Sequence, residues 1–130
     1  MKQDIENRKD IDLLMVRFYE RAMSDDQIGY IFTDVAKLDL DHHLPIIGDF
    51  WETLLFRTGD YARYGRTPLQ VHGELNEKTP LEPVHFRRWL QLFEASVDEL
   101  FSGMRADFIK LRAEAIANRM VNFLSGVPAL

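Results

Sequence analysis

The side chains that could carry chemistry in this chain begin with four histidines, His42, His43, His72 and His85. The chain has no cysteine, which excludes disulfides, thiolate catalysis and cysteine-based metal sites. A transition-metal or haem site would therefore use His, Met, Tyr or carboxylate ligands. No two histidines are spaced as in a helical zinc site, and neither a glycine-rich phosphate loop nor a Gly-x-Ser-x-Gly motif occurs. Hydrolases and nucleotide-binding enzymes are accordingly disfavoured.

His72 is the histidine with the most informative surroundings. It follows Leu69 by three residues on a short segment that ends at Gly73, so both side chains would share one face of a helical turn. Tyr19 and Trp89 stand on apolar stripes, where a buried O–H or N–H needs a hydrogen-bond partner. Spacing alone is compatible with a ligand-binding role for these three residues and also with ordinary core or surface positions.

Helical periodicity dominates the sequence that must position these residues. Apolar residues recur every three or four positions from about Ile11 to Met23, from Ile47 to Leu55, from Glu82 to Gly103, and from Ile109 to Gly126. No segment shows sustained alternation of apolar and polar residues, and no Asn-Gly hairpin occurs. The sequence predicts an all-α fold.

Three local signals set the expected element boundaries. Ser24 and Gln27 have the spacing of a capping box, which predicts a short helical turn through Phe32. Pro45 fits best in the first turn of its helix, which would leave His43 at or just before the helix start. Residues 57–68 contain two glycines and a proline, and they predict an irregular connection.

Composition indicates one ordinary globular domain over residues 1–130. Hydrophobic residues make up 46% of the chain and charged residues 28%. A net charge of −5 argues against nucleic acid or an anionic membrane as a partner. No stretch approaches the roughly 20 apolar residues of a membrane span, and the polar N-terminus is unlike a signal peptide. The absence of cysteine is compatible with a cytoplasmic location.

A series of short motifs in a fixed order connects these features. The motifs are Phe18-Tyr19, Ile31-Phe32, His43-Leu44-Pro45, Asp49-Phe50-Trp51, Pro68 to His72, His85 to Leu90, Val97 to Phe101, Gly103 and Arg112-Ala113. Each is weak alone, but together they cover the chain from about Ile11 to Met120. In this order and with these gaps the chain resembles the group III truncated haemoglobins.

The resemblance implies a two-over-two helical sandwich around haem b. His72 would bind the iron on the proximal side, and Tyr19 and Trp89 would donate hydrogen bonds to a diatomic ligand on the distal side. His43 would stand near the distal entrance, and Phe32 would pack against the macrocycle. The expected apolar wall comprises Ile47, Phe50, Leu54, Leu69 and Phe86.

Two details of the resemblance stay open. The family's glycine usually stands two residues before the proline that precedes the proximal histidine, whereas Gly65 is three before Pro68. Candidates for the propionate contacts are Tyr61, Arg63 and Arg66. Pro45 disfavours helical backbone in the residue before it. We therefore expect His43 to act as a movable gate and not as a fixed second iron ligand, the alternative being that it faces solvent beside His42.

Three functions compete on this basis. The first is binding of oxygen, nitric oxide or carbon monoxide at a pentacoordinate iron. The second is an enzyme, a nitric oxide dioxygenase or a peroxidase-like protein, which would need a separate reductase because the sequence contains no flavin or nicotinamide domain. The third is a helical protein that has kept the fold and lost the haem. The sequence leaves the oligomeric state open.

Overall fold

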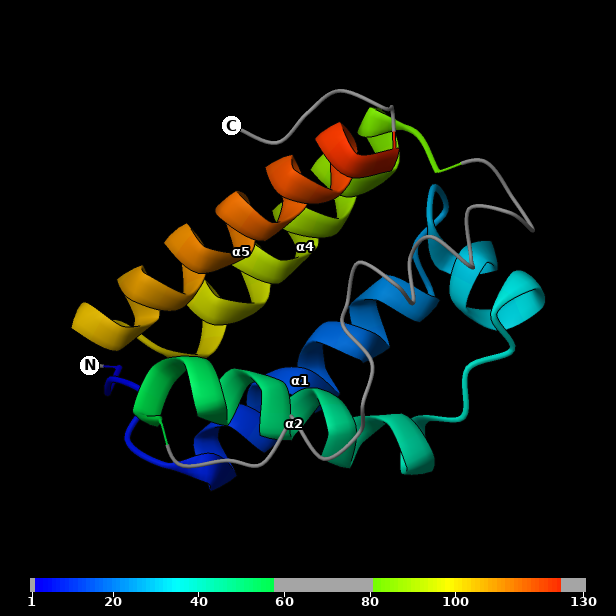
Figure 1. The fold of residues 1–130 in the computed structure, drawn as a ribbon. Helices are drawn as coiled ribbons and strands as arrows, with labels where there is room; N and C mark the ends of the chain where they lie inside the picture. The colour runs from blue at the N-terminus through cyan, green and yellow to red at the C-terminus, as the bar shows by residue number, and fades with distance from the viewer. Residues whose placement is uncertain (1, 58–80, 125–130) are drawn as a thin grey trace.

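The computed structural model describes residues 2–57 and 81–124, and every regular element within these ranges is helical. The order is α1 (Arg8–Met23), the π-helical turn η1 (Ile31–Val35), α2 (Leu40–Phe56), α4 (Pro83–Leu100) and α5 (Met104–Leu124). Figure 1 shows α1 and α2 in one layer and the antiparallel pair α4 and α5 in the other. The predicted all-α class and the two-over-two arrangement are confirmed.

Helix α1 begins earlier than its apolar periodicity predicts. The side chain of Asn7 accepts a hydrogen bond from the backbone N–H of Asp10 at 3.2 Å, which caps the helix at residue 8. The predicted apolar stripe is buried as expected, and it comprises Ile11, Leu14, Met15, Phe18, Tyr19 and Ala22. The helix therefore presents Tyr19 to the interior between the two layers.

The predicted capping box at Ser24 and Gln27 is wrong. The Ser24 hydroxyl donates back to the carbonyl of Glu20 at 2.7 Å, and Asp25 is the residue that accepts from the N–H of Gln27 at 3.0 Å. Asp25 is fixed in this position by Arg88 of α4, whose Nη2 lies 2.7 Å from its carboxylate. The ion pair with Arg88, which is distant in the sequence, therefore favours Asp25 over Ser24 as the residue that accepts this hydrogen bond.

Helix α2 contains Pro45 in its interior, contrary to the prediction of a first-turn proline. Asp39 caps the helix by accepting from the N–H of Asp41 at 3.1 Å, and the N–H of His43 donates to the Asp39 carbonyl at 2.9 Å. His43 therefore lies within the helix and not at or before its start. Pro45 removes one hydrogen bond from the helix, but its own carbonyl accepts from Nη2 of Arg8 at 3.2 Å.

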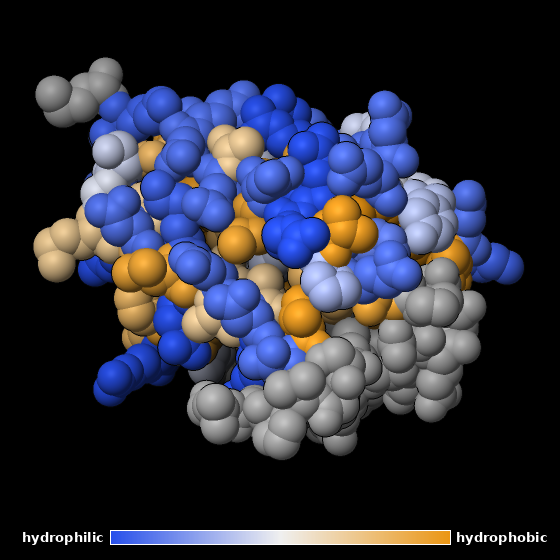
Figure 2. Space-filling view, turned by 90° about the horizontal axis from the view of Figure 1, so that it is seen from above, coloured by the Kyte–Doolittle hydropathy of each residue, from blue (hydrophilic) through white to orange (hydrophobic). Residues whose placement is uncertain are grey.

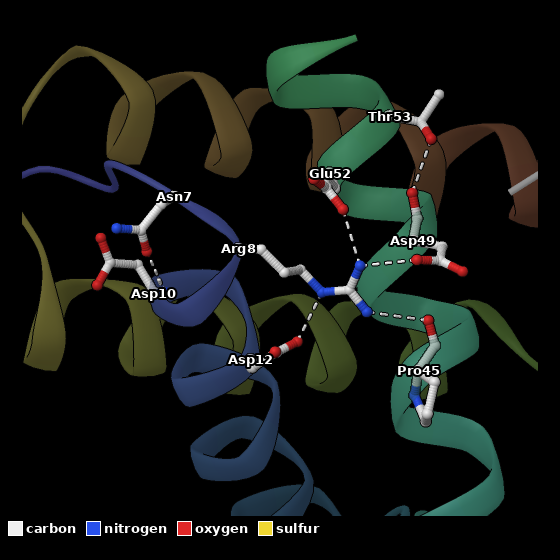
Figure 3. Close-up of polar contacts among 8 residues, drawn as sticks. All are labelled: Asn7, Arg8, Asp10, Asp12, Pro45, Asp49, Glu52 and Thr53. Carbon is white, nitrogen blue, oxygen red and sulfur yellow. Dashed lines mark hydrogen bonds and ion pairs between the residues drawn. The ribbon is translucent and has the colours of Figure 1, made fainter. Parts of the chain in front are cut away.

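Arg8 fixes the start of α1 against the middle of α2, as Figure 3 shows. Its Nη1 lies 2.7 Å from Asp49 and 2.8 Å from Glu52, and its Nε lies 2.8 Å from Asp12. Gly48 makes room for the guanidinium, because a Cβ there would lie 2.5 Å from Nη2 of Arg8. This contact sets the spacing of the two helices that carry Tyr19 and His43.

Helices α4 and α5 are joined by the short segment 101–103. Helix α4 ends at Leu100, three residues before the glycine predicted to end it, and α5 begins at Met104, before the first residue of its predicted apolar stripe, Ile109. The cap of α5 comes from the other end of the chain. The Asp4 carboxylate accepts from the N–H groups of Arg105 and Ala106 at 2.9 and 2.8 Å.

Aromatic side chains fill the space between the layers. Phe18 of α1 makes edge-to-face contacts with Trp89 and Phe93 of α4, with ring centroids 5.8 and 5.4 Å apart. Trp51 of α2 also packs on Phe93, with ring centroids 5.2 Å apart. Among the described residues, the helices include none of the length and apolarity that a membrane span requires.

Candidate functional site

A cavity of about 200 Å³ lies between the two layers. Its described lining is almost wholly apolar and aromatic, which is typical of a small-molecule or cofactor site. The lining residues come from every described helix: Met15, Phe18, Tyr19, Ile28, Ile31, Phe32, Ala36, Leu38, His43, Ile47, Phe50, Trp51, Leu81, His85, Phe86, Trp89, Phe93, Ile116, Ala117 and Met120.

Tyr19 and His43 form a hydrogen-bonded pair at this cavity. The Tyr19 hydroxyl lies 2.8 Å from Nε2 of His43, and the ring planes stand nearly perpendicular at 86°. Burial raises the pKa of Tyr19 well above its ordinary value, so the phenol stays protonated. The alternative that His43 faces solvent beside His42 is wrong, because His43 is half-buried at the cavity while His42 is exposed.

Trp89 brings a second donor to the cavity from α4. Its ring stacks on Phe93 with centroids 5.4 Å apart and an interplanar angle of 20°. The indole N–H forms no hydrogen bond within the part of the chain that the structure describes, and it is not a buried unsatisfied group. An indole N–H can only donate. Trp89 therefore has a hydrogen-bond donor that no described residue uses, on a ring that lines the cavity.

The structure brings together most of the residues named for this site from the sequence. Phe32, Ile47, Phe50 and Phe86 all line the cavity with Tyr19, His43 and Trp89. Leu54 is not among the lining residues and packs instead against the main core. His72, Leu69 and the propionate candidates Tyr61, Arg63 and Arg66 lie outside the described residues, as does the expected irregular connection apart from its first residue, Arg57.

His85 is a polar lining residue that the sequence analysis did not assign to the site. Its Nδ1 accepts a hydrogen bond from the backbone N–H of Glu82 at 3.0 Å, as part of the capping box that begins α4. In the neutral imidazole the proton must then sit on Nε2. Glu82 and His85 have the spacing of a capping box, and this spacing was the sequence signal that could have drawn attention to His85. The hydrogen bond of a capping box fixes the side chain at the third helical position.

The cavity is suited to a largely apolar molecule that makes a few polar contacts with its walls. The aromatic and aliphatic walls supply contact area, while Tyr19, His43 and Trp89 supply hydrogen-bonding groups. Within residues 2–57 and 81–124, no three His, Asp or Glu side chains are arranged to hold a metal ion directly. The described side chains can exclude water and donate hydrogen bonds.

Comparison with known proteins identifies the family. No family model matches the chain. A curated relative, the group 3 truncated haemoglobin ctb of Campylobacter jejuni, is 32% identical over 127 residues and is covered to 95%, as is this chain. The crystal structure of group III truncated haemoglobin from Campylobacter jejuni superposes with a TM-score of 0.81, at 32% identity and with 95% of each chain covered. The matching sequence and fold show that this chain belongs to the group III truncated haemoglobins, a family of globin-type haem proteins.

Proposed function

We propose that this chain holds haem b in the cavity, binds its iron through His72, and binds oxygen, nitric oxide or carbon monoxide beside Tyr19 and Trp89. The observation that carries the proposal is the pairing of an apolar aromatic cavity with two hydrogen-bond donors on facing layers. These residues fit the group, because a macrocycle requires apolar walls and a diatomic ligand requires few, well-placed donors. When bound, haem supplies a ferrous iron that accepts diatomic gases.

The described side chains would act on the ligand by hydrogen bonding in a dry environment. Tyr19 stays protonated, and Trp89 can only donate, so both favour negative charge on the outer ligand atom. A hydrogen bond to a charged group contributes on the order of 1.5–3 kcal/mol. At about 1.4 kcal/mol per decade, one such bond slows ligand release roughly tenfold to over a hundredfold. This arrangement suits ligand retention or reaction better than transport.

His43 has a separate role in the proposal, that of a gate at the cavity. It is half-buried, and its ring reaches the Tyr19 hydroxyl from α2. Rotation of this ring away from Tyr19 would open the space between the hydroxyl and solvent. A six-coordinate bis-histidine spectrum of the ligand-free protein would contradict a gating role.

The same hydrogen-bonded pair supports a second candidate, the turnover of nitric oxide or peroxide. A phenol hydroxyl and an imidazole 2.8 Å apart can relay a proton, because the hydroxyl can donate one proton as it accepts another and so remains a phenol. This activity would need electrons from a separate reductase. Steady-state consumption of nitric oxide with an added reductant distinguishes it from simple ligand binding.

Absorption spectroscopy of protein supplied with haem tests the main proposal. We expect wild type to show a stable Soret band in ferric, ferrous and carbonmonoxy forms, and His72→Ala to lose or shift it. Added imidazole should restore part of the wild-type spectrum in His72→Ala. His42→Ala is the matched control, because His42 is exposed and does not line the cavity. An unchanged spectrum in His72→Ala would remove this residue as the iron ligand.

A further inference from the structure

The outer face of α5 has an apolar pattern that packing among the described residues does not explain. The helix packs on α4 through the opposite face, where Ala106, Ile109 and Ala113 are buried. On the outer face, Met104 is 86% exposed, Phe108 43% and Leu111 64%. Figure 2 shows the molecule of Figure 1 from above, and hydrophobic residues appear on this face as small patches between hydrophilic ones.

These outer residues follow a heptad spacing. Steps of four and three residues connect the positions that we call the outer seam: Met104, Phe108, Leu111, Ala115, Asn118 and Asn122. This alternation is the a and d pattern of a two-stranded coiled coil. Phe108 and Ala115 then occupy a positions, and Met104 and Leu111 occupy d positions.

Opposite charges border the two sides of the outer seam. Arginines recur every seven residues along one side, at Arg105, Arg112 and Arg119. The acidic residues Asp107 and Glu114 stand seven residues apart along the other side. Arg112, Glu114 and Arg119 are exposed and form no ion pair with the residues that the structure describes. In heptad notation the arginines occupy e positions and the acids g positions.

We infer that the outer seam binds the α5 helix of a second copy of this chain, with the two helices parallel. In a parallel pair, a g residue faces the e residue five positions later in the partner. Glu114 of each copy would then face Arg119 of the other, and Asp107 would face Arg112. An antiparallel pair would place arginine against arginine and acid against acid. The charges therefore select both the partner and the orientation.

The inferred dimer is weak and depends on concentration. The apolar part of the outer seam is short, because Asn118 and Asn122 replace apolar residues at its end. Such a helix pair buries less than about 1,200 Å², which is the range of transient complexes. Polar residues in a seam favour one register at some cost in affinity. We expect a dissociation constant in the micromolar range or above.

Sedimentation velocity of the full, haem-supplied chain between about 10 µM and 1 mM tests the surface. We expect a monomer–dimer equilibrium in wild type and a monomer throughout in Leu111→Glu. Leu13→Glu is the matched control, because Leu13 is a similarly exposed leucine, at 53%, on α1. A wild type that stays monomeric at 1 mM overturns the inference. A dimer that survives Leu111→Glu, or that Leu13→Glu also breaks, does so as well.

Charge reversal tests the parallel orientation. Glu114→Arg should raise the dissociation constant about three- to tenfold, because two symmetry-related ion pairs are lost. Adding Arg119→Glu to Glu114→Arg should restore the wild-type value. A double variant that is no tighter than the single variant contradicts the pairing.

The absence of cysteine allows a second test of the geometry. A parallel pair places the two Ala115 residues opposite each other in the seam, so Ala115→Cys should form a disulfide-linked dimer under mild oxidation. Ala95→Cys is the control, because Ala95 is an exposed alanine on α4. Equal cross-linking in both variants, or none in either, overturns the parallel arrangement.

Discussion

The Tyr19 hydroxyl lies 2.8 Å from Nε2 of His43, and this contact joins α1 to α2 at the cavity. The hydroxyl has a single proton to donate. If His43 donates from Nε2, the Tyr19 proton is available to a ligand, whereas a proton on Nδ1 makes His43 the acceptor. The position of one imidazole proton therefore decides whether Tyr19 can donate into the cavity.

Removing either donor should speed ligand release. We expect Tyr19→Phe or Trp89→Leu to raise the oxygen dissociation rate about tenfold or more, because each removes a hydrogen bond in a site shielded from water. Stopped-flow displacement of oxygen by carbon monoxide measures this rate. Tyr30→Phe is the control, since Tyr30 is 41% exposed and does not line the cavity. Unchanged rates in both Tyr19→Phe and Trp89→Leu would remove these residues from the ligand site.

Truncating the proposed gate should speed ligand association. His43→Ala removes a half-buried ring from the cavity, and we expect a several-fold faster second-order association of carbon monoxide after flash photolysis. The neighbouring His42→Ala changes an exposed ring on the same helix and should leave the rate unchanged. Equal rates in wild type and His43→Ala would show that the ring does not limit access.

Gly48 and Arg8 should be coupled in stability. A Cβ at Gly48 would lie 2.5 Å from Nη2 of Arg8, so Gly48→Ala must displace the guanidinium from Asp49 and Glu52. In an Arg8→Ala background, Gly48→Ala should stabilise the protein by about 1 kcal/mol, because alanine is the better helix former.

In wild type the same substitution should stabilise less or should destabilise, since it also breaks ion pairs that each contribute up to about 1 kcal/mol. Urea unfolding of the four proteins gives the coupling free energy. Additive effects within about 0.3 kcal/mol would show that the guanidinium does not depend on the space at Gly48.

The capping of α5 by Asp4 should make stability depend on acid pH. Burial opposes ionisation of this carboxyl, but hydrogen bonds from the N–H groups of Arg105 and Ala106 outweigh it and lower the pKa of Asp4. Because the pKa of Asp4 is lower in the folded state than its unfolded value of 3.8, the ionised carboxylate stabilises the fold above pH 3.8. This contribution is lost as the pH falls from 3.8 through the folded-state pKa.

We expect Asp4→Ala to cost about 1 kcal/mol in the free energy of unfolding at pH 7, as is usual for a lost helix cap. The difference from wild type should shrink towards pH 3. Thermal unfolding between pH 3 and 7 measures it, with the exposed Asp26→Ala as control. A difference that stays constant over this range would contradict the role of the ionised carboxylate.

The amino-acid sequence by itself determined the helical class and the buried face of α1, because apolar spacing is a local property that holds wherever the helix packs. The order of its motifs also indicated the family and the residues that meet at the cavity, including Tyr19 and Trp89. The outer seam of α5 is not apparent from the longer apolar stripe of this helix, because that stripe marks only the face that packs on the core.

Only the tertiary structure decided the features that depend on contacts between distant segments. Asp4 caps a helix that begins 100 residues later, and Arg88 holds Asp25 in place as a cap. Pro45 is tolerated within α2, where its carbonyl also accepts from Arg8. Local propensities differ by about 1 kcal/mol or less for most residues, so a few tertiary hydrogen bonds are enough to override them.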